Sequence, residues 1–252
     1  MIVLEALLVG LAIGAILGLI GAGGAVVAVP AFLYLFHFSP LAATTASLAV
    51  VAAAAAAGAV PRIRLGQVRM KQALTFWALG IVGTLAGSRL APVIPEVVLV
   101  TGFALVMVGA AAAMWRKSSS SEAADVPQRA AWLLPVVAIA VGVMTGLFGV
   151  GGGFLIVPAL VLVFGLPFGI ATGTSLVVVA LNSVTALLFK FDAWDSVDWH
   201  VPALVVVGGL VGSVVASRWN VGVPRRILER GFAVLLVILA GWMVLELFLT
   251  PA

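Results

Sequence analysis

Gly18-Leu-Ile-Gly-Ala-Gly-Gly-Ala-Val-Val-Ala-Val-Pro30 returns 128 residues later as Gly146-Leu-Phe-Gly-Val-Gly-Gly-Gly-Phe-Leu-Ile-Val-Pro158. Further pairs follow in the same order, at this offset or at one residue more: Thr44 and Thr172, Ser47 and Ser175, Leu48 and Leu176, Ser88-Arg89 and Ser217-Arg218, and Gly102-Phe-Ala and Gly231-Phe-Ala. Chance does not produce a colinear series of this kind. We therefore interpret the chain as an internal duplication of one unit.

The composition is that of a protein whose surface faces lipid. Of the 252 residues, 64% are hydrophobic and 9% are charged, and the mean hydropathy is +1.31. Soluble domains use only about 45 to 50% apolar residues. Between Leu7 and Arg62 the only ionisable side chains are Tyr34 and His37, and this stretch is long enough for two crossings of about 20 residues each. We therefore predict an all-α membrane protein.

Each half divides into five apolar segments, which cover residues 2–20, 24–36, 41–60, 73–91 and 96–115, and then 131–148, 153–165, 169–189, 199–218 and 226–249. The second segment of each half has only 13 residues. That is about 20 Å of helix against a hydrocarbon core of about 30 Å, which is typical of a broken or re-entrant helix. The sequence thus predicts about 8 to 10 transmembrane helices. They form two repeats, residues 1–115 and 131–252, joined by a polar cytoplasmic linker, residues 116–130.

Basic residues predict how the two repeats are oriented. Four of them lie between the third and fourth segments of the first half, whereas the matching loop of the second half has three aspartates and only Lys190. Placing the basic loop in the cytoplasm puts 11 of the 13 lysines and arginines on that side, as the positive-inside rule requires. The second repeat is then inverted, and both termini lie on the outer face of an inner or plasma membrane. If both short segments were re-entrant, the repeats would instead be parallel.

The duplicated glycine clusters are the first candidate site. Glycine permits a left-handed backbone and close approach to a ligand, and the free N–H groups at the start of the next half-helix attract anions. Two inverted copies would bring two such turns towards a shared site near the membrane midplane. The alternative is close helix packing through small residues. The glycines concerned are Gly21, Gly23 and Gly24 in the first half, and Gly149, Gly151, Gly152 and Gly153 in the second.

Polar side chains follow each glycine cluster at the start of the third segment. Their hydroxyl groups can donate to an oxyanion, or they can bond back to their own helix or to a neighbouring one. Asn182 lies deeper in its segment and is matched by Ala54, so it either lines the same site or forms an interhelical hydrogen bond. The hydroxyl residues are Thr44 and Ser47 in the first half, and Thr172, Thr174 and Ser175 in the second.

Arg89 and Arg218 close the fourth segment of each half. An arginine at a helix end usually extends to the lipid headgroups. Its planar guanidinium also suits bidentate binding of an oxyanion, so both residues are candidates for a gate or vestibule.

The chain has no pattern typical of an enzyme. It lacks cysteine and has two histidines, so a metal site is not expected, and no Walker loop or Gly-x-Ser-x-Gly elbow is present. We therefore expect no cofactor. The basic residues lie in short segments between apolar runs, which argues against nucleic-acid binding.

The paired Gly-Leu-Ile-Gly-Ala-Gly-Gly and Gly-Leu-Phe-Gly-Val-Gly-Gly-Gly motifs, each followed by Val-Pro and a Thr/Ser-rich helix start, resemble the TauE/SafE sulfite exporter family over essentially the full length. The resemblance implies export of sulfite or an organosulfonate across a bacterial cytoplasmic membrane, driven by a proton or sodium gradient. The residues alone reach only a transporter of small solutes. The alternatives are an anion channel, a permease for another small anion such as a carboxylate, and a membrane subunit that transports nothing.

Overall fold

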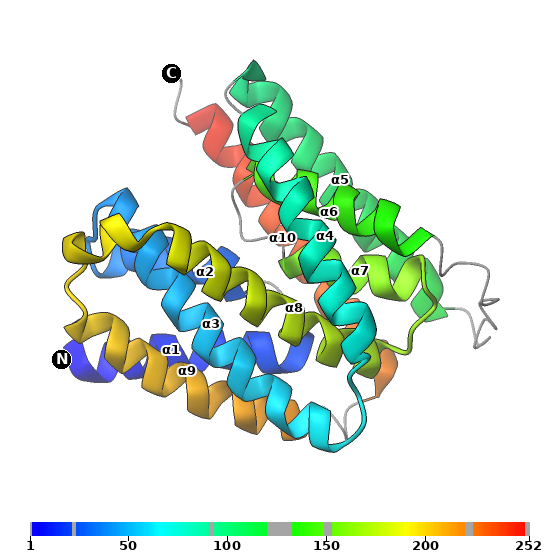
Figure 1. Cartoon of the computed structure of the whole chain (residues 1–252), viewed down its shortest axis with the longest axis horizontal. Coiled ribbons are helices and arrows are strands. Elements are labelled where there is room, and N and C mark those ends of the chain that lie inside the picture. Colours follow the sequence, from blue (N-terminus) through cyan, green and yellow to red (C-terminus); the bar gives the residue numbers. More distant parts are fainter. Residues whose placement is uncertain are drawn as a thin grey trace.

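The computed structural model describes residues 2–21, 24–90, 93–119, 133–148, 153–219 and 224–249, and in these ranges every regular element is a helix (Figure 1). This confirms the predicted all-α class. The ten apolar segments of the sequence correspond in order to α1 to α10. Their bounds are α1 Ile2–Ile20, α2 Gly24–Pro30, α3 Pro40–Arg64, α4 Met70–Leu90, α5 Glu96–Ser119, α6 Leu133–Phe148, α7 Gly153–Leu162, α8 Phe168–Phe189, α9 His200–Trp219 and α10 Arg225–Leu249.

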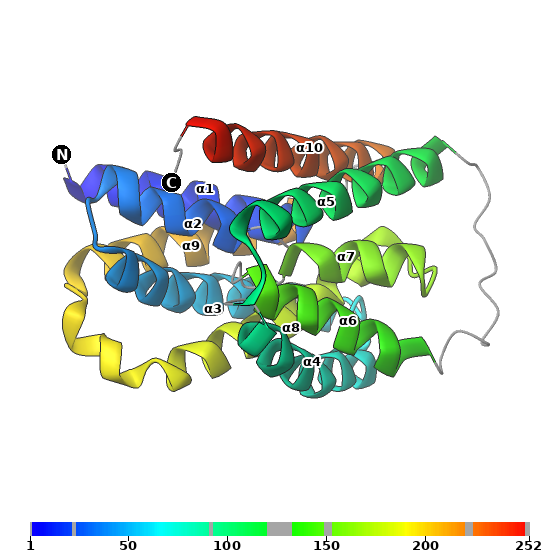
Figure 2. The same ribbon diagram turned by 90° about the horizontal axis from the view of Figure 1, so that it is seen from above.

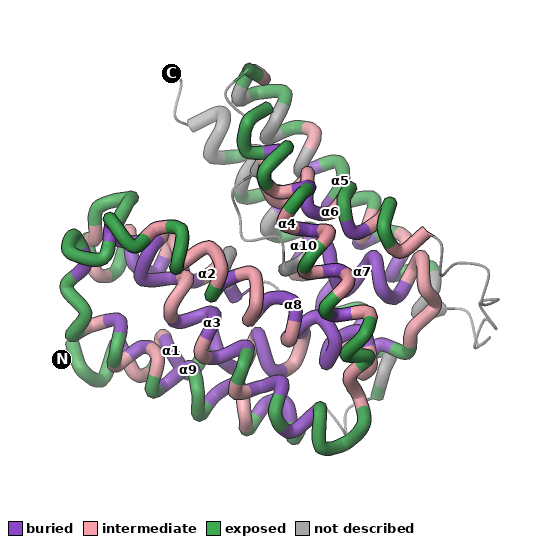
Figure 3. Tube along the Cα trace, in the orientation of Figure 1, coloured by how far each residue is buried: buried purple, intermediate pink, exposed green. Residues whose placement is uncertain are grey.

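Five of the described helices, α1, α3, α4, α8 and α9, are long and apolar enough to cross a membrane. Many large apolar side chains on the outer faces of the bundle are exposed, among them Leu4, Leu8 and Leu105, as expected where lipid is the solvent. The buried positions concentrate on α3 and on the first half of α8 (Figure 3). The third helices of the two halves therefore form the centre of the protein.

The helices pair across the two halves. The first helix of each half packs against the fourth helix of the other, α1 on α9 and α6 on α4, while α3 packs on α8 and α5 on α10 (Figures 1 and 2). Along α1, Gly10 lies against Val205 and Gly18 against Ser213. The residue numbers on the two helices rise together, so α1 and α9 run parallel, and the glycine contacts of α4 and α6 show the same direction.

Glycines permit the close approach within the two parallel pairs. A Cβ atom on Gly14 of α1 would lie 2.1 Å from the carbonyl oxygen of Gly209 on α9. In the other pair, a Cβ atom on Gly142 of α6 would lie 2.3 Å from the carbonyl oxygen of Gly80 on α4. A larger residue would force the backbones apart, because these contacts are to main-chain atoms. Packing through small residues is therefore the role of these helix glycines.

The turn after the second segment has the same geometry in both halves. His37 has φ 55° and Gly165, 128 positions later, has φ 62°. The amide of Phe38 donates to the carbonyl of Phe32, and the amide of Leu166 donates to that of Leu160, at the same spacing. In the first half Pro30 does not end its helix, since a π-helical turn, Ala31–Leu35, continues directly from it. The second segment of the first half is thus α2 followed by this π-helical turn.

Candidate functional site

The glycine turn of the first half is held against the start of α8. Gly21 has φ +76°, its amide donates to the carbonyl of Leu17, and its own carbonyl accepts from the hydroxyl of Ser175 at 2.9 Å. A Cβ atom on Gly21 would lie 2.4 Å from a methyl carbon of Thr172. The structure therefore brings three predicted site residues together, two of them from the opposite half. Gly24 begins α2, and Gly23 lies outside the described residues.

For the second half, the predicted glycines Gly149, Gly151 and Gly152 lie outside the described residues, and Gly153 begins α7.

Most of the predicted hydroxyl donors are already engaged by their own helices. The hydroxyl of Ser47 donates to the carbonyl of Thr44, that of Thr172 to Phe168 and that of Thr174 to Ile170. This is the back-bonding expected of Ser and Thr inside helices. Ser175 is the exception, because it donates to Gly21. In this conformation the other hydroxyls can serve an anion only after they rotate away from these carbonyls.

The predicted hydroxyl residues of the first half and those of the second half lie at opposite ends of the antiparallel α3–α8 pair. Thr44 accepts a hydrogen bond from Nζ of Lys190 at the end of α8, whereas Thr172 lies beside Gly21 near the end of α3. From Thr44 to Arg62 the helix rises by about 27 Å, at 1.5 Å per residue. The structure therefore groups the residues around Thr172 and those around Thr44 into two separate clusters.

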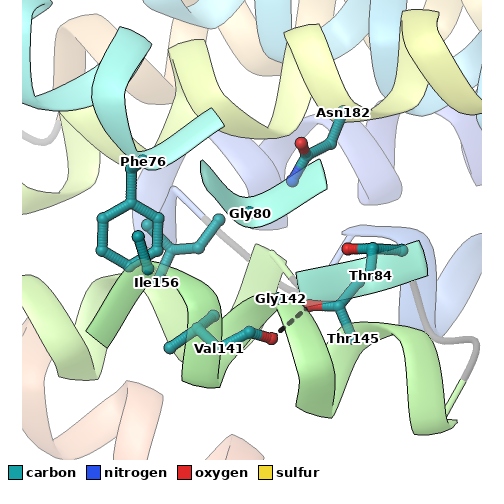
Figure 4. A pocket seen from close by; sticks show the side chains of 9 residues that line it. Phe76, Gly80, Thr84, Val141, Gly142, Thr145, Ile156 and Asn182 are labelled. Atoms are coloured by element: carbon teal, nitrogen blue, oxygen red, sulfur yellow. Dashed lines mark hydrogen bonds between the residues drawn. The ribbon is translucent and has the colours of Figure 1, made fainter. Parts of the chain in front are cut away.

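A small cavity lies between α4, α6, α7 and α8 (Figure 4). Its volume is about 10 Å³, room for about one water molecule. Asn182, Thr84 and Thr145 supply its polar side chains, and Phe76 and Ile156 its large apolar ones. Gly80 lines it from the centre of α4.

Asn182 is the predicted site residue that reaches this cavity. The hydroxyl of Thr145 is bonded to the carbonyl of Val141, whereas Asn182 makes no hydrogen bond to another described residue. Ala54, which matches Asn182 in the first half, packs instead against α9: its Cβ atom lies 3.4 Å from the position that a Cβ atom on Gly209 would take. The first half therefore has no carboxamide at the matching position, while Asn182 offers both a donor and an acceptor to a cavity that both halves line.

Arg89 and Arg218 lie in the last turns of α4 and α9, and both are exposed. Neither arginine lines the cavity, and neither is among the nearest neighbours of Gly21. Among the described residues no group of three or more His, Asp and Glu side chains could hold a metal ion.

Sequence reasoning missed Arg62, which was counted among the cytoplasmic loop residues. Its side chain is 1% exposed and lies inside the bundle. One Nη atom donates to the carbonyl of Gly18 at 2.7 Å and the other to that of Gly169 at 3.3 Å. The signal in the sequence was its match to Lys190, 128 residues later, since each residue is the first cation after the third segment of its half.

The comparisons with known proteins agree on one class. A "Probable membrane transporter protein" of Xylella fastidiosa is 30% identical over 240 residues, covering 92% of this chain and 91% of the relative. The "Probable membrane transporter protein YdhB" of Bacillus subtilis is 28% identical over 88% of this chain and 92% of its own length. No solved structure matches the chain.

The family model described as "Sulfite exporter TauE/SafE" matches residues 6–243. The match runs from α1 to α10 and includes both glycine clusters of the sequence, so it covers nearly the whole chain. The chain therefore belongs to the TauE/SafE sulfite exporter family and is a multi-pass membrane transporter rather than an enzyme.

Proposed function

We propose that this protein is a secondary transporter that exports a small anion, sulfite or an organosulfonate, from the cytoplasm across a bacterial inner membrane. Family membership supports the substrate class. The observation that carries the proposal is the cavity at Asn182, because it places the carboxamide of this α8 residue beside Gly80 at the centre of α4, the depth at which transporters bind substrates.

The cavity of about 10 Å³ is too small for sulfite, which has four heavy atoms, so the site widens when the anion binds. Asn182 then donates to an oxyanion oxygen, and the hydroxyls of Thr84 and Thr145 rotate towards it. As predicted from the sequence, backbone N–H groups of the glycines between α6 and α7 would contribute further donors to the anion.

Alternating access has a structural basis in the exchanged helix pairs. Because α1 packs on α9 and α6 on α4 through backbone contacts, each pair moves as a unit that contains helices of both halves. The directions of the α1–α9, α4–α6 and α3–α8 pairings are compatible with an inverted repeat, in which α1 and α9 cross inwards while α4 and α6 cross outwards. Rocking of one parallel pair against the other would open the cavity to either side.

The main alternative is an anion channel. The cavity at Asn182 has room for about one water molecule, so an anion does not pass it freely in this conformation, and saturation of the flux distinguishes a carrier from a channel. A proton or sodium gradient drives the export in our proposal.

The deciding experiment is flux in liposomes that contain the purified protein. We expect sulfite and sulfonate transport that saturates with concentration and follows an imposed pH or sodium gradient. Gly23→Val and Gly151→Val should abolish it without loss of expression, and Asn182→Ala should reduce it. Flux that does not saturate and ignores both gradients would indicate a channel. Flux of carboxylates in place of sulfur oxyanions would assign a different substrate.

A further inference from the structure

A second polar cluster lies where α1, α3 and α9 end and α8 begins. The carbonyl of Gly18 accepts from an Nη atom of Arg62 at 2.7 Å and from the hydroxyl of Ser217 at 3.4 Å. Ser213 lies one turn before Ser217 on α9, and both hydroxyls face Gly58, one turn before Arg62 on α3. A Cβ atom at Gly58 would lie 2.3 Å from Oγ of Ser213 and 3.0 Å from Oγ of Ser217. The cluster is thus confined to about one helical turn of each helix.

The positive charge in this cluster has no counter-ion among the described residues. Arg62 is 1% exposed, and its two hydrogen bonds go to neutral carbonyl groups. Burying an ion costs several kcal/mol unless it is paired. A buried charge that is paired only with neutral groups therefore requires a role that explains its cost. The partial negative charge of the α1 C-terminus, at Gly18, offsets only part of this charge.

Several donors of the cluster are unused. A guanidinium has five N–H donors, and the structure gives Arg62 two hydrogen bonds, with Nε left without a partner. The hydroxyl of Ser213 is fully buried and also has no partner. The hydroxyl of Ser217 is held only by a long bond of 3.4 Å. Native proteins rarely leave such groups unpaired, so each requires an explanation.

We propose that Arg62, Ser213 and Ser217 form a binding site for the transported oxyanion, separate from the Asn182 cavity. The inference rests on the proposed function and adds to it a charged residue, Arg62, that binds the anion. An anion with two or more oxygens on one atom fits, because Nε and an Nη atom of the guanidinium bind two oxygens side by side. The serine hydroxyls contact the remaining oxygen. With the basic loop in the cytoplasm, this is the site that an exported anion reaches first.

The test uses the full-length protein in vesicles of neutral phosphatidylcholine, so that no anionic headgroup can occupy the cluster. Sulfite is the probe, and the measurements are flux against concentration and the rise in Tm on adding sulfite. Ser213→Ala should raise the KM about tenfold, the loss of one hydrogen bond to a charged ligand, and reduce the sulfite-induced rise in Tm. Its Tm without sulfite should not fall, because the variant removes an unpaired hydroxyl.

Arg62→Lys should also raise the KM, since it keeps the charge but loses the planar pair of donors. Ser183→Ala, a buried serine of α8 outside the cluster, is the matched control and should match the wild type. If Ser213→Ala and Arg62→Lys transport sulfite with the wild-type KM, Arg62 only caps α1 and the inference is wrong, while the proposed function stands. If the wild type moves no sulfur oxyanion, the proposed function fails. An unchanged wild-type Tm on adding sulfite then overturns the inference as well.

Discussion

Arg62 and Lys190 occupy equivalent positions 128 residues apart, and each donates a hydrogen bond to the first turns of the other's helix. Arg62 ends α3 and reaches the carbonyl of Gly169 on α8. Lys190 follows α8 and reaches Oγ1 of Thr44 on α3. One cation thus joins the antiparallel pair at each end.

The two ends are packed differently. Arg62 is fully buried, whereas Lys190 and Thr44 are only half-buried. In a transporter built from two similar halves, the ends are expected to exchange packed and open states during the cycle. The conformation described here is the one that is tightly packed at Arg62.

The first prediction concerns the Gly21 turn. Gly21→Ala should destabilise the protein by about 1 to 3 kcal/mol, because alanine is strained at positive φ and its Cβ would meet Thr172. Gly66→Ala is the matched control, since Gly66 has φ +68° but no atom within 4 Å of its Cβ position. Thermal unfolding of both variants separates backbone strain from contact. Equal losses of Tm would show that the contact with Thr172 contributes nothing.

The helices could be predicted from apolar length and repeated spacing. The end of α3 could not, because the apolar segment stops at residue 60 whereas the helix continues to Arg64. The break at Gly21 has the positive φ that its glycines suggested. The left-handed residue after the second segment could be read from Gly165 but not from His37, because histidine gives no sign of that backbone. Only the match to Gly165, 128 positions later, connects the two.

The helix partners and the burial of Arg62 could not be predicted from local pattern. Which helices pair is decided by glycines far apart in the chain, such as Gly14 and Gly209. Arg62 lies in a run of basic residues at a helix end, and this run is typical of a cytoplasmic loop. Its side chain turns inwards because Gly18 and Gly169 present carbonyl groups there, which only the tertiary structure shows.

A second prediction tests the parallel pairs. Gly14→Leu or Gly142→Leu should prevent folding, because the side chain would have to displace the backbone of α9 or α4. Gly241→Ala on α10 is the control, since its Cβ position has no neighbour within 4 Å, and alanine raises helix propensity by about 1 kcal/mol. Size-exclusion chromatography in detergent measures the folded fraction. A monodisperse Gly14→Leu protein with the wild-type Tm would contradict the packing of α1 on α9.

A third prediction tests the cavity. Asn182→Leu should fill it and abolish sulfite flux, with little change in Tm, because the carboxamide has no partner among the described residues. Asn182→Ala should retain partial flux with a raised KM, since it leaves the space but removes the donor. Val184→Ala, an exposed position on the same helix, is the control. Wild-type kinetics in both Asn182 variants would remove this residue from the substrate site.

The last prediction tests orientation, and the absence of cysteine from the chain makes it direct. Single cysteines are introduced by Leu65→Cys after α3 and Ser196→Cys after α8, both at exposed positions. Because α3 and α8 run antiparallel, an impermeant maleimide should label the two from opposite sides. The positive-inside rule places Leu65 in the cytoplasm. In intact cells Ser196→Cys should therefore be labelled, and Leu65→Cys only after permeabilisation. The reverse result would invert the whole topology, and labelling from one side would show that α3 and α8 do not cross the membrane in opposite directions.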